Sequence, residues 1–250
     1  MKTPFFLAFV LFQIIACHSG VNSHEPQAKQ GTTAYNSDEF ESIPMNELND
    51  VWLEMNHAKE EVGVFMSTNG VVFKDPVFDY PYYFNMTDGK LEVKNRGEFG
   101  GEFNFIPSDS LKDTIRILNT NVVSVFSFEG EIYILQGIAH MMDQGGQMSR
   151  LLRSGDTFEL DSVLSLSSAP EAMAIYNDRL IIAGHRNLTV IRNFEIETCI
   201  PAFWDSLYPN TVVPVSDDEI YIGFRAGYAK FSLEQQSIKY YKLKSITSVV

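Results

Sequence analysis

A strand–turn–strand unit that recurs near the end of the chain constrains the fold more than any other feature. Residues 170–186 align without gaps to residues 209–225, and a proline, an aspartate, a glycine and an arginine recur at an offset of 39 residues. An earlier copy, residues 121–134, shares Val-Val and Glu-Ile-Tyr-Ile with the later stretch, at an offset of 88 residues that is close to two units. We therefore expect a domain built from repeats of about 40 residues.

Repeats of this length, each made of four strands, are typical of propeller blades. The chain resembles β-propellers in this respect, although it lacks the Gly-His and Trp-Asp pairs of WD40 repeats. About 190 residues at this period predict a propeller-like domain of roughly five blades. A β-sandwich of similar hairpins is the alternative, because any repeated hairpin would give the same matches. Either fold is mainly β.

Local signals predict short strands separated by tight turns. The dipeptides Asn69-Gly70 and Asp88-Gly89 predict hairpins over 64–74 and 82–94, because both pairs suit two-residue turns. Alternating apolar residues predict further strands at 112–118, 121–128, 131–136, 148–153, 157–162, 171–176, 179–184, 188–193, 211–215, 219–224, 227–232 and 236–243. Apolar residues at helical spacing after Pro44 predict one amphipathic helix over 45–60, docked on the domain by its apolar face.

The first 17 residues have the pattern of a secretory signal. Lys2 supplies positive charge, and residues 4–16 form a mostly apolar run that is too short for a membrane span of about 20 residues. The sequence Ile14-Ile15-Ala16-Cys17 resembles the lipobox of bacterial lipoproteins. That resemblance implies a signal peptide over 1–16, acylation of the Cys17 thiol and, from His18, an outer-membrane anchor facing the periplasm. An ordinary secretory signal, giving a secreted protein, is the alternative.

The rest of the chain divides into a tether, residues 17–40, and a single β-rich domain, residues 41–250. The tether is polar and rich in Ser, Gly, Asn and Gln, a composition that predicts a flexible linker. The chain carries 19 basic and 32 acidic residues, for a net charge of −13. This acidity argues against nucleic acid as a partner and predicts that membrane contact comes through acyl chains only.

In a propeller, the turns after the second strand of each repeat lie at the end where ligands generally bind. Those turns, the loop 136–147 and the connection 201–209 carry side-chain types that are enriched in protein interfaces. The predicted partner-binding residues are His140, Met141, Met142, His185, Arg186, Phe203, Trp204, Tyr208 and Arg225. Two alternatives stay open: the arginines brace turns or neighbouring carboxylates, and Phe203 and Trp204 pack in the core.

The sequence gives little support for catalysis. It has no His-x-x-x-His, Cys-x-x-Cys or Gly-x-Ser-x-Gly pattern, so we expect no catalytic residues, metal or other cofactor. Once Cys17 is acylated, Cys199 has no disulfide partner, and we expect it to be a buried small hydrophobic residue.

These features favour a non-catalytic, lipid-anchored binding protein of the periplasm. In build, the chain resembles immunity and inhibitor lipoproteins, which implies a protein partner such as a basic toxin or hydrolase delivered to the envelope. One alternative is an envelope hydrolase or lyase with its site at the mouth of a propeller channel. Another is a scaffold of an outer-membrane assembly complex.

Overall fold

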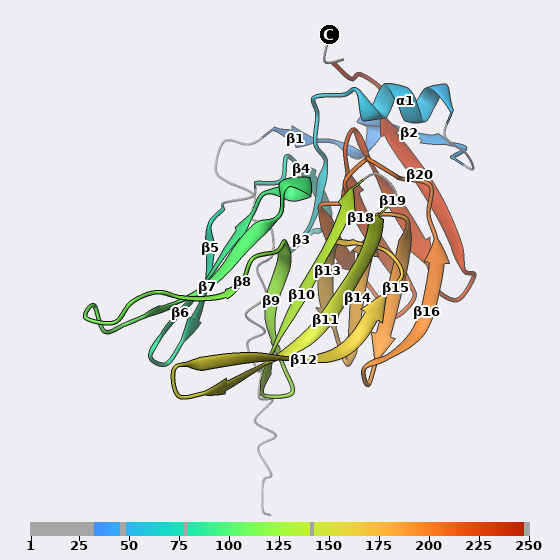
Figure 1. Ribbon diagram of the computed structural model, residues 1–250. Coiled ribbons are helices and arrows are strands. Elements are labelled where there is room, and N and C mark those ends of the chain that lie inside the picture. The colour runs from blue at the N-terminus through green and yellow to red at the C-terminus, as the bar shows by residue number, and fades with distance from the viewer. Residues whose placement is uncertain (1–32, 46–48, 78–79, 141–142, 248–250) are drawn as a thin grey trace, which may run out of the picture.

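The computed structural model describes residues 33–45, 49–77, 80–140 and 143–247. The predicted signal peptide, Cys17, most of the predicted tether, Met141 and Met142 lie outside these ranges. Within them, the prediction of a mainly β fold is confirmed (Figure 1).

The described strands form five antiparallel sheets, which we number in chain order. In spatial order, sheet 1 contains β1 (Ala34–Tyr35), β4 (Gly70–Lys74) and β3 (Gly63–Ser67). Sheet 2 contains β5 (Tyr82–Met86), β6 (Gly89–Asn95), β7 (Gly101–Pro107) and β8 (Ile115–Leu118). Sheet 3 contains β9 (Val122–Phe128), β10 (Glu131–His140), β11 (Asp143–Ser154) and β12 (Thr157–Leu166).

The two segments of the closest repeat fold into the first two strands of sheets 4 and 5. Sheet 4 contains β13 (Pro170–Tyr176), β14 (Arg179–Gly184), β15 (Asn187–Arg192) and β16 (Glu195–Pro201). Sheet 5 contains β17 (Thr211–Pro214), β18 (Glu219–Phe224), β19 (Gly227–Ser232), β20 (Ser237–Leu243) and then β2 (Phe40–Ile43). In both sheets, the first strand of the repeat lies at a sheet edge.

Hydrophobic cores lie between neighbouring sheets rather than in one central layer. The buried residues group between sheets 2 and 3, between sheets 3 and 4, between sheets 4 and 5, and between sheets 5 and 1. The largest cluster, between sheets 4 and 5, contains Trp204, Phe224 and Phe231, all fully buried. Each of sheets 3, 4 and 5 therefore buries both faces.

The two predicted hairpins are confirmed, although each two-residue turn lies one residue before the expected pair, at Thr68-Asn69 and at Thr87-Asp88. Ser67 pairs with Gly70 across the first turn, and Gly70 has a φ of 109°, a conformation that glycine adopts without strain. Met86 pairs with Gly89 across the second turn. The strands at β1, β2, β7 and β16 were not expected from the sequence, although β7 buries Phe103 and Phe105.

The prediction of a loop over 136–147 is wrong, because its described residues belong to β10 and β11, which pair with each other. Gln136 pairs with Gln147, and Gly137 pairs with Gly146. A Cβ atom on either glycine would lie 2.4 or 2.5 Å from Pro170 Cδ, so the two glycines allow this hairpin to pass close to the start of β13. His140 is thus the last residue of β10 rather than part of an open loop.

The predicted N-terminal helix exists but is shorter than expected. Helix α1 spans Asp50–Asn56, and the Asn49 side chain accepts a hydrogen bond from the Trp52 backbone N–H at 3.1 Å. Met55 is fully buried in the core between sheets 4 and 5. The helix ends early because the following residues pair with sheet 5: Ala226 N–H donates to Glu60 at 2.9 Å, and Glu61 forms a β-bridge with Arg225.

The segment 34–43, which we call the N-terminal clasp, joins the first and last sheets. It contributes β1 to sheet 1, the short 3-10 helix Ser37–Glu39, and β2 to sheet 5 (Figure 1). Phe40 of the clasp lies with its ring centroid 5.0 Å from that of Phe73 in sheet 1 and 5.0 Å from that of Tyr228 in sheet 5. Sheets that are far apart in the sequence are therefore held together by an aromatic cluster.

Candidate functional site

Two equivalent turns carry the arginines of the repeat. Arg186 follows β14, and its Nε donates to the Asp205 carboxylate. Arg225 follows β18, and its Nε donates to Glu61 Oε1 at 3.1 Å. Asp205 precedes sheet 5 and Glu61 precedes sheet 1, so each arginine pairs with an acid in a segment that leads into a neighbouring sheet.

The two arginines differ in burial and in the groups that they contact. The Arg225 side chain is 26 % exposed, donates to the Asn56 carbonyl at 2.9 Å, and lies 4.8 Å from the Tyr208 ring centroid. The Arg186 side chain is 56 % exposed. Burial raises the pKa of Glu61 above its ordinary value, although Arg225 acts in the opposite direction. Arg225 is therefore a brace within the fold, whereas Arg186 presents much of its surface to solvent.

Two indole groups fix the connection that carries Asp205. Trp204 Nε1–H donates to the Gly184 carbonyl at 2.9 Å, and Trp52 Nε1–H donates to the Asp205 carbonyl at 2.7 Å. Trp204 has no exposed surface, so the prediction that it contacts a partner is wrong and its core alternative holds. Phe203, in contrast, is 41 % exposed, so it does not pack in the core.

A pocket with a volume of about 530 Å³ lies at this end of the molecule, and we call it the rim pocket. It forms where β9 and β13 begin and where the paired ends of β10 and β11 and the turn after β14 approach the connection to sheet 5. Its lining residues are Trp52, Arg96, Gly97, Phe99, Asn121, Gly137, Ala139, Gln144, Ala169, Pro170, Glu171, His185, Arg186, Asp205, Ser206 and Tyr208.

Large side chains stand at the border of the rim pocket. Phe99, in the short 3-10 helix Gly97–Phe99, is 82 % exposed, and Tyr208 is 46 % exposed. Tyr208 holds a φ of 53°, which places a bulky residue in the left-handed region. The border thus combines exposed aromatic rings with the solvent-facing guanidinium of Arg186.

Polar groups lie deeper in the rim pocket. His185, which is 8 % exposed, has its Nδ1 3.1 Å from Glu171 Oε1. The His185 backbone N–H donates to the Ala169 carbonyl at 2.7 Å, which holds the turn against the start of β13. Asn121 Oδ1 is buried and has no hydrogen-bond partner among the described residues.

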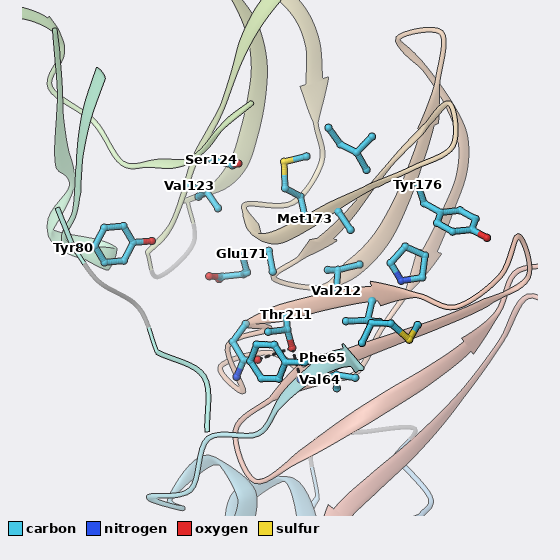
Figure 2. Close-up of a pocket in the computed structure, with 17 residues that line it drawn as sticks. Val64, Phe65, Tyr80, Val123, Ser124, Glu171, Met173, Tyr176, Thr211 and Val212 are labelled. Carbon is cyan, nitrogen blue, oxygen red and sulfur yellow. Dashed lines mark hydrogen bonds between the residues drawn. The ribbon is translucent and has the colours of Figure 1, made fainter. Parts of the chain in front are cut away.

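A second pocket, of about 330 Å³, continues inward from Glu171, and we call it the central pocket. It lies where the edge strands β3, β9, β13 and β17 of four different sheets come together (Figure 2). The Val64 N–H of β3 donates to Thr211 Oγ1 of β17 at 2.8 Å, which joins two of these edges. Glu171 lines both pockets and therefore marks their junction.

Tyr80 faces Glu171 across one side of the central pocket. Figure 2 shows the Tyr80 hydroxyl and the Glu171 carboxylate pointing toward each other. Burial, reinforced by the negative charge of Glu171, raises the pKa of Tyr80 to about 12. The phenol is therefore neutral at physiological pH.

The structure brings together only part of the predicted binding set. His185, Arg186 and Tyr208 line the rim pocket, and Arg225 lies against Tyr208. Phe203 is exposed but does not line the pocket, and Met141 and Met142 lie outside the described residues. Phe99, Arg96, Trp52 and Glu171 were missed, although Gly97 and Gly100 flank Phe99 as they would flank an exposed turn.

Cys199 is exposed, so the prediction that it is a buried hydrophobic residue is wrong. It lies in β16, the outermost strand of sheet 4, where alternate side chains face solvent. The Asn187 amide donates toward its Sγ at 3.4 Å.

Comparison with known proteins gives no family. No protein-family model matches the chain, and no curated protein matches it significantly. Across the described ranges, no group of three or more His, Cys, Asp or Glu residues is arranged to hold a metal ion. No helix in the same ranges is long and apolar enough to cross a membrane.

Proposed function

We propose that the protein is a lipid-anchored binding protein of the bacterial envelope that recognises another protein at the rim pocket. One observation carries this proposal: exposed Phe99 and Tyr208 stand with Arg186 around a pocket of about 530 Å³. Aromatic and arginine side chains beside a pocket are the usual centre of a protein–protein interface. A side chain of the partner would enter the pocket between the two rings.

The proposal includes a propeller-like arrangement of the five sheets as blades. Its support is that sheets 1, 3, 4 and 5 direct an edge strand toward one central pocket and that separate cores lie between neighbouring sheets. A sandwich of two layers would have one core between its two sheets. The contact between sheets 5 and 1, made through the N-terminal clasp, further favours a ring.

The chemistry of the partner follows from charge. At a net charge of −13, the chain would attract a basic partner and speed its encounter at low ionic strength. A basic toxin or hydrolase delivered to the envelope fits this requirement, and the protein would then act as its inhibitor or immunity factor. Acylation at Cys17 would keep the rim pocket within reach of the membrane where such a partner arrives.

Capture from envelope extracts tests the binding face. The tagged mature chain is compared with Phe99→Asp and with a matched control, Leu111→Asp. Leu111 is 93 % exposed and follows β7, whereas Phe99 precedes the same strand, so the two residues lie at opposite ends of sheet 2. We expect one stoichiometric partner with the wild type and with Leu111→Asp, and its loss with Phe99→Asp. Equal capture by both variants would refute the proposed face.

Membrane fractionation tests the anchor. Replacing Cys17 with Ser removes the only proposed acylation site, so the protein should move from the membrane pellet to the soluble periplasmic fraction. Unchanged fractionation of Cys17→Ser would show that the lipobox resemblance is misleading.

The contact between His185 and Glu171 favours hydrolysis or lyase chemistry as a second candidate function. A histidine and a carboxylate 3.1 Å apart at the junction of two pockets have the geometry of an oriented general base. Purified protein would be assayed on peptidoglycan, glycan and ester substrates, with His185→Ala as the comparison. Turnover that disappears with His185→Ala would favour this candidate, and turnover that survives the substitution would exclude His185 as the base.

A further inference from the structure

The central pocket has one carboxylate and no basic group among the described residues that line it. That carboxylate belongs to Glu171, whose side chain is only 24 % exposed and faces His185 on the rim side. Most of the remaining lining is apolar, from β3, β13 and β17. Among the described residues, no lysine or arginine pairs with this carboxylate, so a ligand cation that reaches it from the pocket would gain a favourable charge interaction.

A second polar group in the same pocket has no use in the fold. Ser124 is 2 % exposed, and its Oγ has no hydrogen-bond partner among the described residues. It lines the central pocket from β9, on the opposite side from Thr211 of β17 (Figure 2). Buried hydroxyl groups almost always have a partner, and rotation of the Ser124 side chain toward the pocket would let this hydroxyl bind a ligand.

Aromatic rings complete the lining. Phe65, Tyr80 and Tyr176 come from three different parts of the chain and all border the pocket (Figure 2). Aromatic faces attract cations, and they also pack against apolar ligand surfaces. The volume of about 330 Å³ is at the low end for small-molecule sites, which suits one ring with a short chain.

We propose that the central pocket binds a small organic cation, an ammonium group carried on an apolar body. The ammonium group lies at Glu171, where the central and rim pockets meet, and the apolar body extends inward along β13 between the edge strands. Ser124 supplies a further polar contact. This site is separate from the protein partner proposed above, so failure of the capture experiment leaves the following measurement unaffected.

Three probes of the same shape separate charge from apolar fit: 4-phenylbutylamine, 4-phenylbutanol and 4-phenylbutyrate. Binding is measured by calorimetry and by the NMR shifts of ¹³C-methyl-labelled methionines, because Met66 and Met173 both line the pocket. We expect the amine to bind at least about tenfold more tightly than the alcohol, and the carboxylate not to bind. The Met173 methyl signal, assigned with Met173→Leu, should shift on addition of the amine.

Two substitutions locate the polar contacts. Glu171→Gln should weaken amine binding about tenfold and leave alcohol binding unchanged, while the control Glu195→Gln, an exposed residue of β16 in the same sheet, should change neither. Ser124→Ala removes a hydroxyl that has no partner in the fold, so it should weaken amine binding without lowering the thermal midpoint. If Glu171→Gln does not fold, Ser124→Ala and the comparison of the three probes still test whether the pocket binds an organic cation.

Several outcomes would overturn the proposal. The first is equal affinity for the amine and the carboxylate, and the second is no amine binding at about 1 mM. The third is amine binding that does not shift the Met173 methyl signal. A folded Glu171→Gln variant with unchanged amine affinity would also refute it.

Discussion

Arg186 and Arg225 occupy the same position in two consecutive sheets, and each binds a carboxylate in a segment that leads into a neighbouring sheet. The repeat in the sequence is therefore also a repeat of contacts between sheets. The two residues differ in what else they touch, since Arg225 also contacts Asn56 and Tyr208. Of these two equivalent arginines, Arg225 is therefore mainly structural, whereas Arg186 is largely exposed.

This difference predicts unequal losses of stability. Arg225→Ala removes a backbone hydrogen bond and the partner of the half-buried Glu61, so we expect the free energy of unfolding to fall by about 1–3 kcal/mol. Arg186→Ala removes an ion pair whose arginine is 56 % exposed and whose aspartate is 18 % exposed. Because the exposed guanidinium is well solvated, the loss should be smaller, about 1 kcal/mol. Urea denaturation of the two variants measures both values. A larger loss for Arg186→Ala would show that the exposure of the arginine side chain does not determine how much each contact contributes to stability.

The aromatic cluster of the N-terminal clasp predicts a local effect. Phe40 is 7 % exposed, and its replacement by Ala should lower the free energy of unfolding by about 3–5 kcal/mol, while Phe40→Leu should cost less because it keeps most of the buried surface. Hydrogen exchange should speed up in β1, β2 and β20, but not in sheet 4. Uniform acceleration in all sheets would mean that the clasp has no separate role.

Asp218 predicts a pH dependence of stability. The Glu234 backbone N–H donates to its carboxylate at 2.7 Å and the Ser232 hydroxyl at 2.9 Å, and these bonds lower the Asp218 pKa below its ordinary 3.8. A carboxyl group with a lowered pKa in the folded state contributes stability above the unfolded pKa, and that contribution is lost as the pH falls through the folded pKa.

The difference in denaturation midpoint between wild type and Asp218→Asn should therefore be constant from about pH 7 to pH 5 and shrink below about pH 4. Asp217→Asn, a substitution at the neighbouring residue whose side chain is 75 % exposed, serves as the control for loss of surface charge. A difference that grows at low pH would contradict the assignment.

Cys199 predicts an accessible thiol. With Cys17 replaced by Ser, Cys199 is the only remaining cysteine, so a thiol reagent should modify one group per folded chain without denaturant. Cys199→Ala should abolish the signal. Reaction only after unfolding would show that the Asn187 side chain or β16 shields the sulfur.

Tight turns are what the sequence predicts best. Asn69-Gly70 and Asp88-Gly89 favour a reversal of the chain, so both hairpins could be predicted, although each turn lies one residue earlier than the pair. The repeat likewise places the first two strands of sheets 4 and 5 correctly. Such features depend on residues that are close in the chain.

Long-range pairing is what the sequence did not predict. Residues 136–147 contain three glycines and resemble a loop, yet the described part pairs as β10 and β11, with Gly137 and Gly146 close to Pro170. Strand β2 was missed because its partner, β20, lies near the other end of the chain. Trp204 could not be separated from an interface residue, because burial and interface composition favour the same aromatic side chains.

The pairing of β2 with β20 also sets an order of events during synthesis of the chain. The chain emerges with its N-terminus first, so β2 has no partner until residues 237–243 have followed it. In every shorter nascent chain the Phe40 ring lacks the Tyr228 ring or the strand that holds β2 beside it. Such a chain exposes an unpaired strand and apolar surface to chaperones and proteases. Completion of the fold is thereby tied to arrival of the last strand.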